Sequence, residues 1–228
     1  MSLENIILIL VAGLNFGLAL EVWLINPKNK INIYFALSSL FFGLWSLFEG
    51  LAREAQTASL AYLFARGDNG CSLLVVVFFF LFAFYFPYPI KKLGYLSVTL
   101  IIATTLFMEY VMWFTDWHLN EIILIPHNND YTLSLFGRIL FACFMFYYTF
   151  AAFYLLLKKY FKGLDFAKNI LSVLIATGIV GVFCTFFGVI IPLLFGRNNP
   201  WFAPLFSIPM VIIIAWFLLL GDKKVYIK

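Results

Sequence analysis

The 228-residue chain is far more apolar than a soluble domain: 64% of its residues are hydrophobic, 21% aromatic and 11% charged, and its mean hydropathy is +0.99. These values exclude an ordinary soluble globular protein and indicate an integral membrane protein. The net charge of +4 does not indicate a nucleic-acid-binding protein, because the positive residues are divided among short segments between apolar runs, where they contact lipid headgroups.

Seven apolar runs are long enough to be transmembrane helices, since a span needs about 20 mostly apolar residues. In chain order, the predicted spans are residues 5–25, 31–52, 59–87, 95–115, 132–157, 169–195 and 202–220. No internal repeat is visible, and no polar stretch is long enough to fold as a soluble domain. The predicted fold class is therefore all-α integral membrane, a single seven-helix transmembrane bundle over residues 1–228.

The lysines predict how this bundle is oriented. All of them follow the first, third, fifth or seventh apolar run, so they fall on one side of the membrane. Cytoplasmic loops are enriched in Lys and Arg. We therefore expect the N-terminus outside, the C-terminus in the cytoplasm, and a multi-pass protein of the cell inner (plasma) membrane. The residues concerned are Lys28, Lys30, Lys91, Lys92, Lys158, Lys159, Lys162, Lys168, Lys223, Lys224 and Lys228.

Five ionisable residues within the predicted spans lie in the outer parts of those spans, whereas Glu21 lies near the inner end of the first span. At 1.5 Å per residue, Glu109 and Arg138 both lie roughly 9 Å from the outer ends of their spans. Ionisable groups inside a membrane are costly and often functional. We expect the set to form an outward-facing ligand pocket, flanked by Trp113, or alternatively a structural charge cluster that binds nothing. The set consists of Glu49, Arg66, Asp68, Glu109 and Arg138.

The charges of this set suggest which helices face one another. Arg66 and Asp68 are two residues apart, so on a helix they contact different neighbours. We expect Arg138 to pair with Asp68 or Glu109, and Arg66 to pair with Glu49 or Glu109.

The run Arg-Gly-Asp-Asn-Gly at residues 66–70 interrupts the third apolar stretch and allows two interpretations. Inside the membrane, an irregular backbone is tolerated only where protein or a water-filled cavity satisfies its polar groups. Alternatively, residues 71–87 span the membrane alone, and residues 66–70 form a solvated outer turn. Either interpretation places a polar face toward the outside.

The outer segment 116–131 is the longest connection and carries both histidines, His118 and His127. Their spacing matches no established metal-ligand pattern, and exposed loop histidines are commonly unliganded, so we expect no metal. The apolar centre of the segment, residues 122–125, indicates a lid or a short hairpin that covers the end of the bundle.

Several stretches resemble the seven-transmembrane N-terminal sensor region of bacterial and archaeal histidine kinases. The second span begins Asn-Ile-Tyr-Phe-Ala-Leu and has a mid-span Trp45, and the third span begins Leu-Ala-Tyr-Leu-Phe-Ala before Arg66. Similar stretches are Phe-Ala-Phe-Tyr-Phe-Pro at residues 82–87, Ile-Pro-Leu-Leu-Phe-Gly at 191–196 and Pro-Leu-Phe-Ser at 204–207. The resemblance implies that Trp45 and Arg66 are family-typical positions, with Arg66 inside the third helix. That family's kinase domain has no counterpart in these 228 residues, so the resemblance implies a sensor half that works through a partner.

The expected function follows from these features. No phosphate-binding loop, zinc-protease motif, nucleophile elbow or paired-carboxylate motif is present, so we expect neither an enzyme nor a cofactor. The leading hypothesis is a membrane sensor or receptor-like module for signal transduction, with an outward-facing polar pocket. Its expected partners are membrane lipids, a protein in the membrane or at its cytoplasmic face, and a small ligand from the outer side, but no nucleic acid. The alternative is a non-catalytic structural or assembly subunit of a larger membrane complex.

Overall fold

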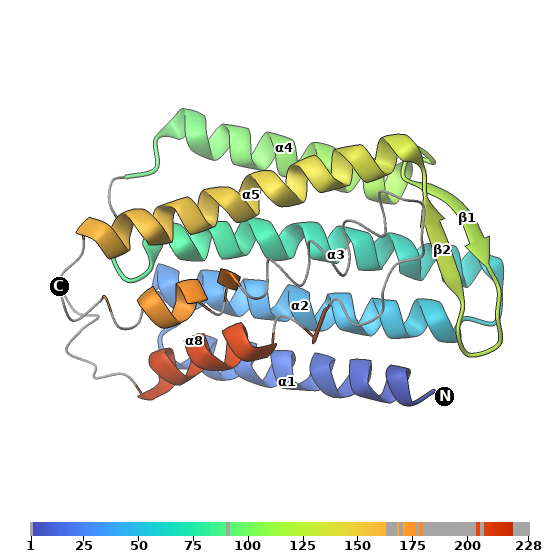
Figure 1. The fold of residues 1–228 in the computed structure, drawn as a ribbon, viewed down its shortest axis with the longest axis horizontal. Helices are drawn as coiled ribbons and strands as arrows, with labels where there is room; N and C mark the ends of the chain where they lie inside the picture. The colour runs from blue at the N-terminus through green and yellow to red at the C-terminus, as the bar shows by residue number, and fades with distance from the viewer. Residues whose placement is uncertain are drawn as a thin grey trace.

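A computed structural model describes residues 2–89, 92–162, 168, 171–176, 178–179, 204–205 and 208–220. The elements are α1 (Leu3–Ile25), α2 (Lys30–Glu54), α3 (Ala58–Tyr85), α4 (Tyr95–Phe114), β1 (Leu119–Ile123), β2 (Asp130–Leu133), α5 (Leu135–Lys162) and α8 (Ile208–Leu220). Helices α1 to α5 lie side by side and alternate in direction, and the two strands cover one end of them (Figure 1). We name that end the hairpin end and the opposite end the lysine end.

Polar residues between the apolar runs determine where the helices begin. The side chains of Ser2, Asn29 and Thr57 accept a hydrogen bond from the backbone N–H two or three residues later, at 3.3, 2.9 and 3.3 Å respectively. Ser134 does the same for α5 at 2.9 Å. Each bond satisfies one of the N–H groups that have no partner inside a helix, so each cap stabilises its helix start.

Within the part of the chain that the structure describes, five helices, α1 to α5, are long and apolar enough to cross a membrane. They contain 20 to 28 residues, which corresponds to about 30–42 Å at 1.5 Å per residue and matches a hydrocarbon core of about 30 Å. The chain is therefore a helical protein with the character of a multi-pass membrane protein. The first five predicted spans agree with these helices to within a few residues, except at the end of the fifth.

The end of α5 differs because it extends to Lys162, whereas the predicted span stops at residue 157. Lys159, which we expected in a cytoplasmic loop, is buried inside the bundle. The predicted sixth span, 169–195, lies mostly outside the described residues. Of the predicted seventh span, 202–220, the structure describes α8, which has 13 residues and packs against α1.

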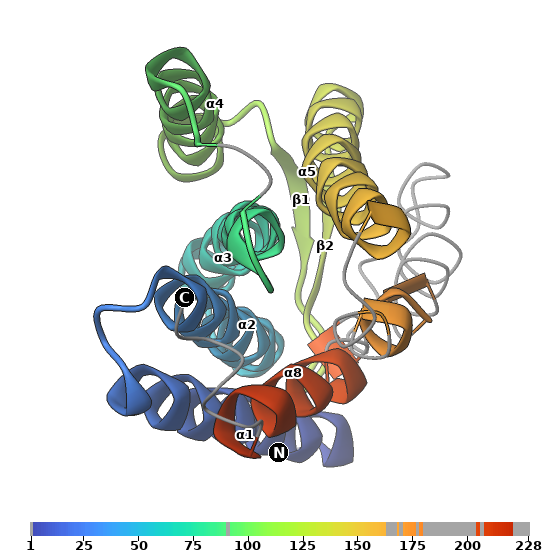
Figure 2. The same ribbon diagram turned by 90° about the vertical axis from the view of Figure 1, so that its left-hand side faces the viewer.

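Helix α3 is the centre of the bundle. Helix α2 packs on one of its sides and α4 and α5 on others, as the end view shows (Figure 2). Consecutive residues Val75, Val76 and Val77 are all buried, and so are Phe79 and Phe82. A helix that is apolar on every side is buried on every side, and this composition accounts for the central place of α3.

Helix α4 is the least buried of the five. Only Met108, Val111 and Met112 of its residues are buried, and they pack against α3 and α5. Ile101 and Trp113 are partly buried, and most of the other apolar side chains between Tyr95 and Phe114 are exposed. In a membrane this surface meets lipid.

Residues 66–70 are regular helix within α3, so the alternative of a solvated turn is wrong and the backbone is not interrupted. The two glycines instead allow close packing. A Cβ atom on Gly67 would lie 2.9 Å from the ring of Phe48 in α2. One on Gly70 would lie 2.8 Å from Trp113 Nε1 in α4. Glycine at these positions lets bulky side chains of two neighbouring helices reach the α3 backbone.

Strands β1 and β2 form the antiparallel hairpin that the apolar centre of segment 116–131 predicted. Tyr131 lies opposite Ile122, and a register irregularity separates Leu119 from Glu121. Leu119, Tyr131 and Leu133 are buried, which shows that this face of the hairpin packs onto the helix ends. The hairpin covers the ends of the helices and brings polar residues to them.

Candidate functional site

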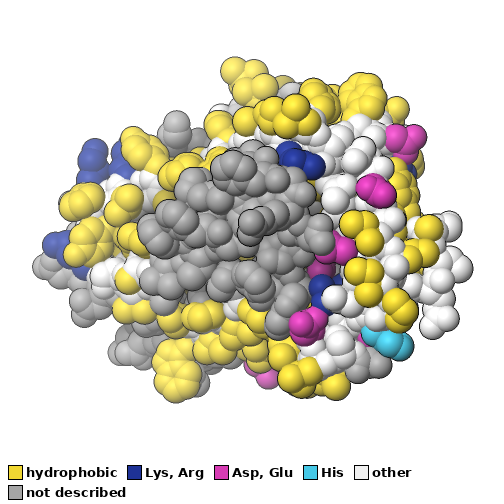
Figure 3. Space-filling model, turned by 45° about the vertical axis from the view of Figure 1, so that its right-hand side comes forward, with side chains coloured by type: hydrophobic (Ala, Val, Ile, Leu, Met, Phe, Trp, Pro, Cys, Tyr) yellow, Lys and Arg dark blue, Asp and Glu magenta, His cyan; other side chains and the backbone are white. Residues whose placement is uncertain are grey.

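The two ends of the bundle differ in charge. Lysines gather at the lysine end, where Glu21 of α1 also lies, whereas the described arginines and the other described acids gather at the hairpin end, and Figure 3 shows part of this separation on one face. The hairpin-end residues are Glu4, Glu49, Arg53, Glu54, Arg66, Asp68, Glu109, Asp116, Glu121, Asp130 and Arg138. The candidate site therefore lies at the hairpin end.

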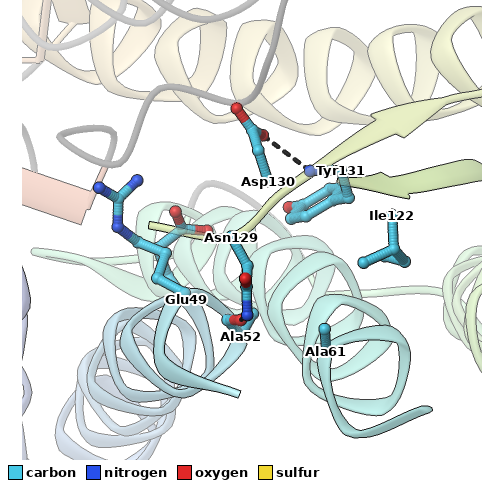
Figure 4. Close-up of a pocket in the computed structure, with 8 residues that line it drawn as sticks. Glu49, Ala52, Ala61, Ile122, Asn129, Asp130 and Tyr131 are labelled. Atoms are coloured by element: carbon cyan, nitrogen blue, oxygen red, sulfur yellow. Dashed lines mark hydrogen bonds between the residues drawn. The ribbon is translucent and has the colours of Figure 1, made fainter. Parts of the chain in front are cut away.

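A small polar pocket opens between α2, α3 and the hairpin (Figure 4). About 240 Å³ of space lies within its outline, including open solvent at its mouth, and about 10 Å³ of this is accessible to the centre of a water molecule. Its lining consists of Glu49, Ala52, Arg53, Ala61, Ile122, Asn129, Asp130 and Tyr131. Glu49 is the one member of the predicted site that lines this pocket, and Asp68 lies behind Tyr131.

Tyr131 ties the hairpin to α3 at the back of this pocket. Its hydroxyl donates a hydrogen bond to Asp68 Oδ2 and accepts one from Asn69 Nδ2 at 3.1 Å. Asp68 also lies within hydrogen-bonding reach of Trp45 and Glu49 of α2. Burial, and then the charge of Asp68, raises the pKa of Tyr131 well above its usual value, so the phenol keeps its proton and remains a donor.

Arg53 ties the hairpin turn to α1 and α2. Its guanidinium contacts Glu4 and Asn128, and its Nε donates to Asn5 Oδ1 at 3.1 Å. The side chain is almost fully buried. The predicted second span ends at residue 52, just before Arg53, and the sequence analysis did not include Arg53 in the site.

Asn129 completes the attachment of the turn. Its side-chain amide donates to the carbonyl oxygens of Ala55 at 2.6 Å and Ala52 at 3.2 Å, and its backbone N–H donates to the carbonyl of Arg53 at 3.1 Å. These carbonyls belong to the last turn of α2 and the residue after it, where carbonyl groups have no partner inside the helix.

Arg66 points to the opposite side of α3 and binds the end of α4. It donates to the carbonyls of Trp113 and Thr115, the latter at 3.0 Å, and forms an ion pair of 2.9 Å with Asp116. Its guanidinium also lies over the ring of Tyr62. The expected pairing of Arg66 with Glu49 or Glu109 is wrong, because Asp116 and the free carbonyls of α4 lie closer to this face.

Glu109 and Trp113 form a second contact between α3 and α4. Trp113 Nε1 donates to Glu109 Oε2 at 3.0 Å, and both atoms lie against Gly70. A spacing of four residues places the two side chains on the same face of α4. Trp113 therefore holds Glu109 rather than flanking an open pocket.

Arg138 lies in the first turn of α5, not deep in a span, because the hairpin occupies the residues up to Leu133. Its Nε donates to the carbonyl of Leu133 at 2.7 Å. Among the described residues it forms no ion pair, so the expected pairing with Asp68 or Glu109 is wrong. The six predicted residues thus separate into Glu49 and Asp68 on one side of α3, Arg66, Glu109 and Trp113 on the other, and Arg138 apart from both.

The two histidines have different surroundings. His127 is exposed at the hairpin turn, and its Nδ1 lies 2.7 Å from Glu54 Oε2. His118, which we expected to be exposed, is fully buried beside Gly137 and Phe141 of α5. Within the described ranges, no three His, Cys, Asp or Glu side chains are grouped so that they could hold a metal ion.

At the lysine end, Lys159 of α5 makes three short hydrogen bonds to the end of another helix. Its Nζ donates to the carbonyl oxygens of Ala83, Phe84 and Phe86 at 2.7, 2.7 and 2.6 Å. These carbonyls belong to the end of α3, which lies inside the bundle. The lysine side chain therefore satisfies the C-terminal end of α3.

Comparison of the chain with protein-family models, with curated proteins and with solved structures finds no match.

Proposed function

We propose that this protein is a membrane sensor or receptor-like module, in which a small polar ligand from outside binds the pocket under the hairpin. The observation that carries the proposal is the polar pocket itself, which lies at the end of the bundle opposite the lysines. The resemblance to sensor regions of histidine kinases supports the same class of function, with the signal passed to a partner protein.

The proposed arrangement in the membrane has seven spans, with residues 169–195 and 202–220 completing the five described ones. The lysine end then faces the cytoplasm and the hairpin end faces outward, in the plasma membrane. Labelling with a membrane-impermeant thiol reagent tests this orientation with Asn120→Cys and Lys92→Cys, two exposed positions at opposite ends. Asn120→Cys reacts in intact cells and Lys92→Cys only after lysis. The reverse result contradicts the orientation.

The chemistry of the lining indicates a small polar ligand. Three of the described lining residues, Glu49, Arg53 and Asp130, are ionisable, and Asn129 and Tyr131 add hydrogen-bonding groups. A small ligand that combines charge with hydrogen-bonding groups, such as an amine, complements such a lining. Because Tyr131 lines the pocket and bonds Asp68, a ligand there also acts on the contact between hairpin and α3. To shift the helix bundle from one conformation to another, the ligand must bind one of the two conformations more tightly than the other.

Thermal unfolding of the purified protein in detergent, with a panel of small amines and metal chlorides, tests this function. A ligand at 100 times its Kd stabilises the folded state by about 2.7 kcal/mol. We expect Glu49→Gln and Asp130→Asn to remove the stabilisation, and Glu121→Gln, an exposed hairpin residue, to retain it. Equal stabilisation of all three variants would show that the pocket is not the binding site.

The alternative, an assembly subunit of a larger membrane complex, is favoured by one observation. Helix α4 buries only three side chains and exposes Tyr95, Phe107, Tyr110 and Phe114. In this case α4 contacts another membrane protein, and the charges at the hairpin end only hold the bundle together. Purification from native membranes in mild detergent distinguishes the sensor from the assembly subunit. A partner that copurifies in stoichiometric amount with the unmodified protein, and is lost with the Phe107→Ala variant, supports the assembly function.

A further inference from the structure

His118 lies immediately before β1, where the hairpin meets the first turns of α5, and its side chain is fully buried. A Cβ atom on Gly137 of α5 would lie 2.7 Å from the carbonyl oxygen of His118 and 3.1 Å from its Nδ1. The ring of Phe141, further along α5, lies 6.0 Å from the imidazole, measured between ring centres. Position 137 therefore needs glycine, and the imidazole is enclosed against α5 rather than exposed at the surface.

The described surroundings of this imidazole do not support a positive charge. Neither ring nitrogen of His118 has a hydrogen-bond partner among the described residues. Burial, and then the positive charge of Arg66 in α3, lowers the pKa of His118 to about 3, so the packed ring is neutral. The other charged residues of the adjoining segments have contacts of their own: Asp116 with Arg66, Glu109 of α4 with Trp113, and Arg138 of α5 with the carbonyl of Leu133.

Ser134, the residue before α5, holds the segment that carries His118. Its backbone N–H donates to the carbonyl of His118 at 2.8 Å, and its hydroxyl donates to the carbonyl of Trp117. Trp117 is itself exposed, and the strand register is irregular between Leu119 and Glu121, just beyond this segment. Breaking the contacts with Ser134 therefore frees His118 without unfolding a helix, and such a local opening costs less free energy than global unfolding.

We propose that His118 makes the hairpin end of the protein acid-responsive, because a proton taken up by this side chain releases the start of β1 from α5. A charged imidazole has two N–H donors, and bulk water offers acceptors to both once the segment is released. The hairpin that begins here lines the pocket beneath it through Ile122 and Tyr131, so release loosens the cover of that pocket. The proton is itself the ligand, and the proposal does not require that any molecule binds in the pocket.

The direction and size of the response follow from the two states of the ring. Histidine in water has a pKa of about 6.5. The released ring takes up a proton as the pH falls below this value, whereas the packed ring stays neutral down to about pH 3. The equilibrium constant for release therefore rises by roughly 30-fold between about pH 7.5 and pH 5. His127 acts in the opposite direction, because a proton on its ring strengthens the contact with Glu54 at 2.7 Å.

Hydrogen exchange of the full-length protein in lipid nanodiscs tests the release directly, because the carbonyl of His118 protects the amide of Ser134. Exchange at Ser134 is measured by mass spectrometry at about pH 7.5 and pH 5 and divided by the intrinsic chemical rate at each pH. We expect the equilibrium constant for release to rise by roughly 30-fold in the unmodified protein and in His127→Gln, and by less than about twofold in His118→Phe. An unchanged constant in the unmodified protein, or the same rise in His118→Phe, overturns the proposal.

The charge of the ring gives a second test that needs no variant at position 118. The protein is labelled with ¹⁵N-histidine, and His127→Gln assigns the two NMR signals, since the chain has two histidines. At about pH 5 we expect a neutral His118 ring in molecules whose Ser134 amide is protected, and a charged ring in the released ones. A charged His118 ring with Ser134 as well protected as at pH 7.5 shows that the packed site accepts the proton, and this result overturns the proposal.

Discussion

Replacement of Lys159 by methionine tests how strongly the end of α3 depends on one side chain. The three hydrogen bonds from Lys159 Nζ measure 2.6–2.7 Å. Bonds from a charged donor contribute about 1.5–3 kcal/mol each, so together they amount to about 5–9 kcal/mol. Burying the ammonium group offsets several kcal/mol of this gain. We therefore expect Lys159→Met to lower the free energy of unfolding by about 2–4 kcal/mol, because the aliphatic packing is kept and three buried carbonyls lose their donor.

For a chain of this size, that loss corresponds to a fall in Tm of about 4–16 °C. The assay is thermal unfolding in detergent, followed by tryptophan fluorescence, with titration by a denaturing detergent as an independent measure. Lys162→Met is the matched control, because Lys162 lies three residues after Lys159 on the same helix and is exposed. Its effect should stay within about 0.5 kcal/mol. If Lys159→Met is no more destabilising than Lys162→Met, water replaces the ammonium group and the reasoning is refuted.

Two further substitutions test the contacts of α3 with the hairpin and with α4. Tyr131→Phe removes the donor to Asp68, and we expect a loss of about 1–3 kcal/mol in unfolding free energy and faster proteolysis of the hairpin, because a buried acceptor is left without its bond. Unchanged proteolysis would show that the hydroxyl does not hold the hairpin. Gly70→Ala places a Cβ 2.8 Å from Trp113 Nε1, so we expect a loss of about 1–3 kcal/mol. Gly13→Ala, which meets no atom within 4 Å, should instead be neutral or stabilising by up to about 1 kcal/mol, and equal effects would contradict the packing argument.

The positions of the helices could be predicted from the sequence because a membrane span is defined by its length and hydropathy. Those quantities do not depend on which side of the helix a residue occupies. The first five spans follow for this reason, and the hairpin follows from the apolar centre of segment 116–131.

The contacts of the charged residues could not be predicted because they depend on helix rotation. Arg66 and Asp68 were expected to contact different neighbours, and the structure confirms this. The predicted partners of these two residues were wrong, because a shift of one residue along a helix rotates the side-chain direction by about 100°. Lys159 shows the same limit: a run of lysines indicates an end of the bundle, but not which lysine turns inward.

Local backbone groups also competed with the predicted ion pairs. Arg53 and Arg66 both bind near helix ends, where they contact carbonyls, side-chain amides or nearby acids at the surface of the bundle. A helix end offers several acceptors to a cation, whereas a facing helix offers one carboxylate. Hydropathy and charge counts contain no information about this competition.

Helix α3 is fastened near both of its ends by side chains of other elements, Tyr131 at one end and Lys159 at the other. Movement of the hairpin away from α3 must break the Tyr131 contact, and movement of α5 relative to α3 must break the Lys159 contacts. Helix α4, which buries three side chains, takes part in neither contact.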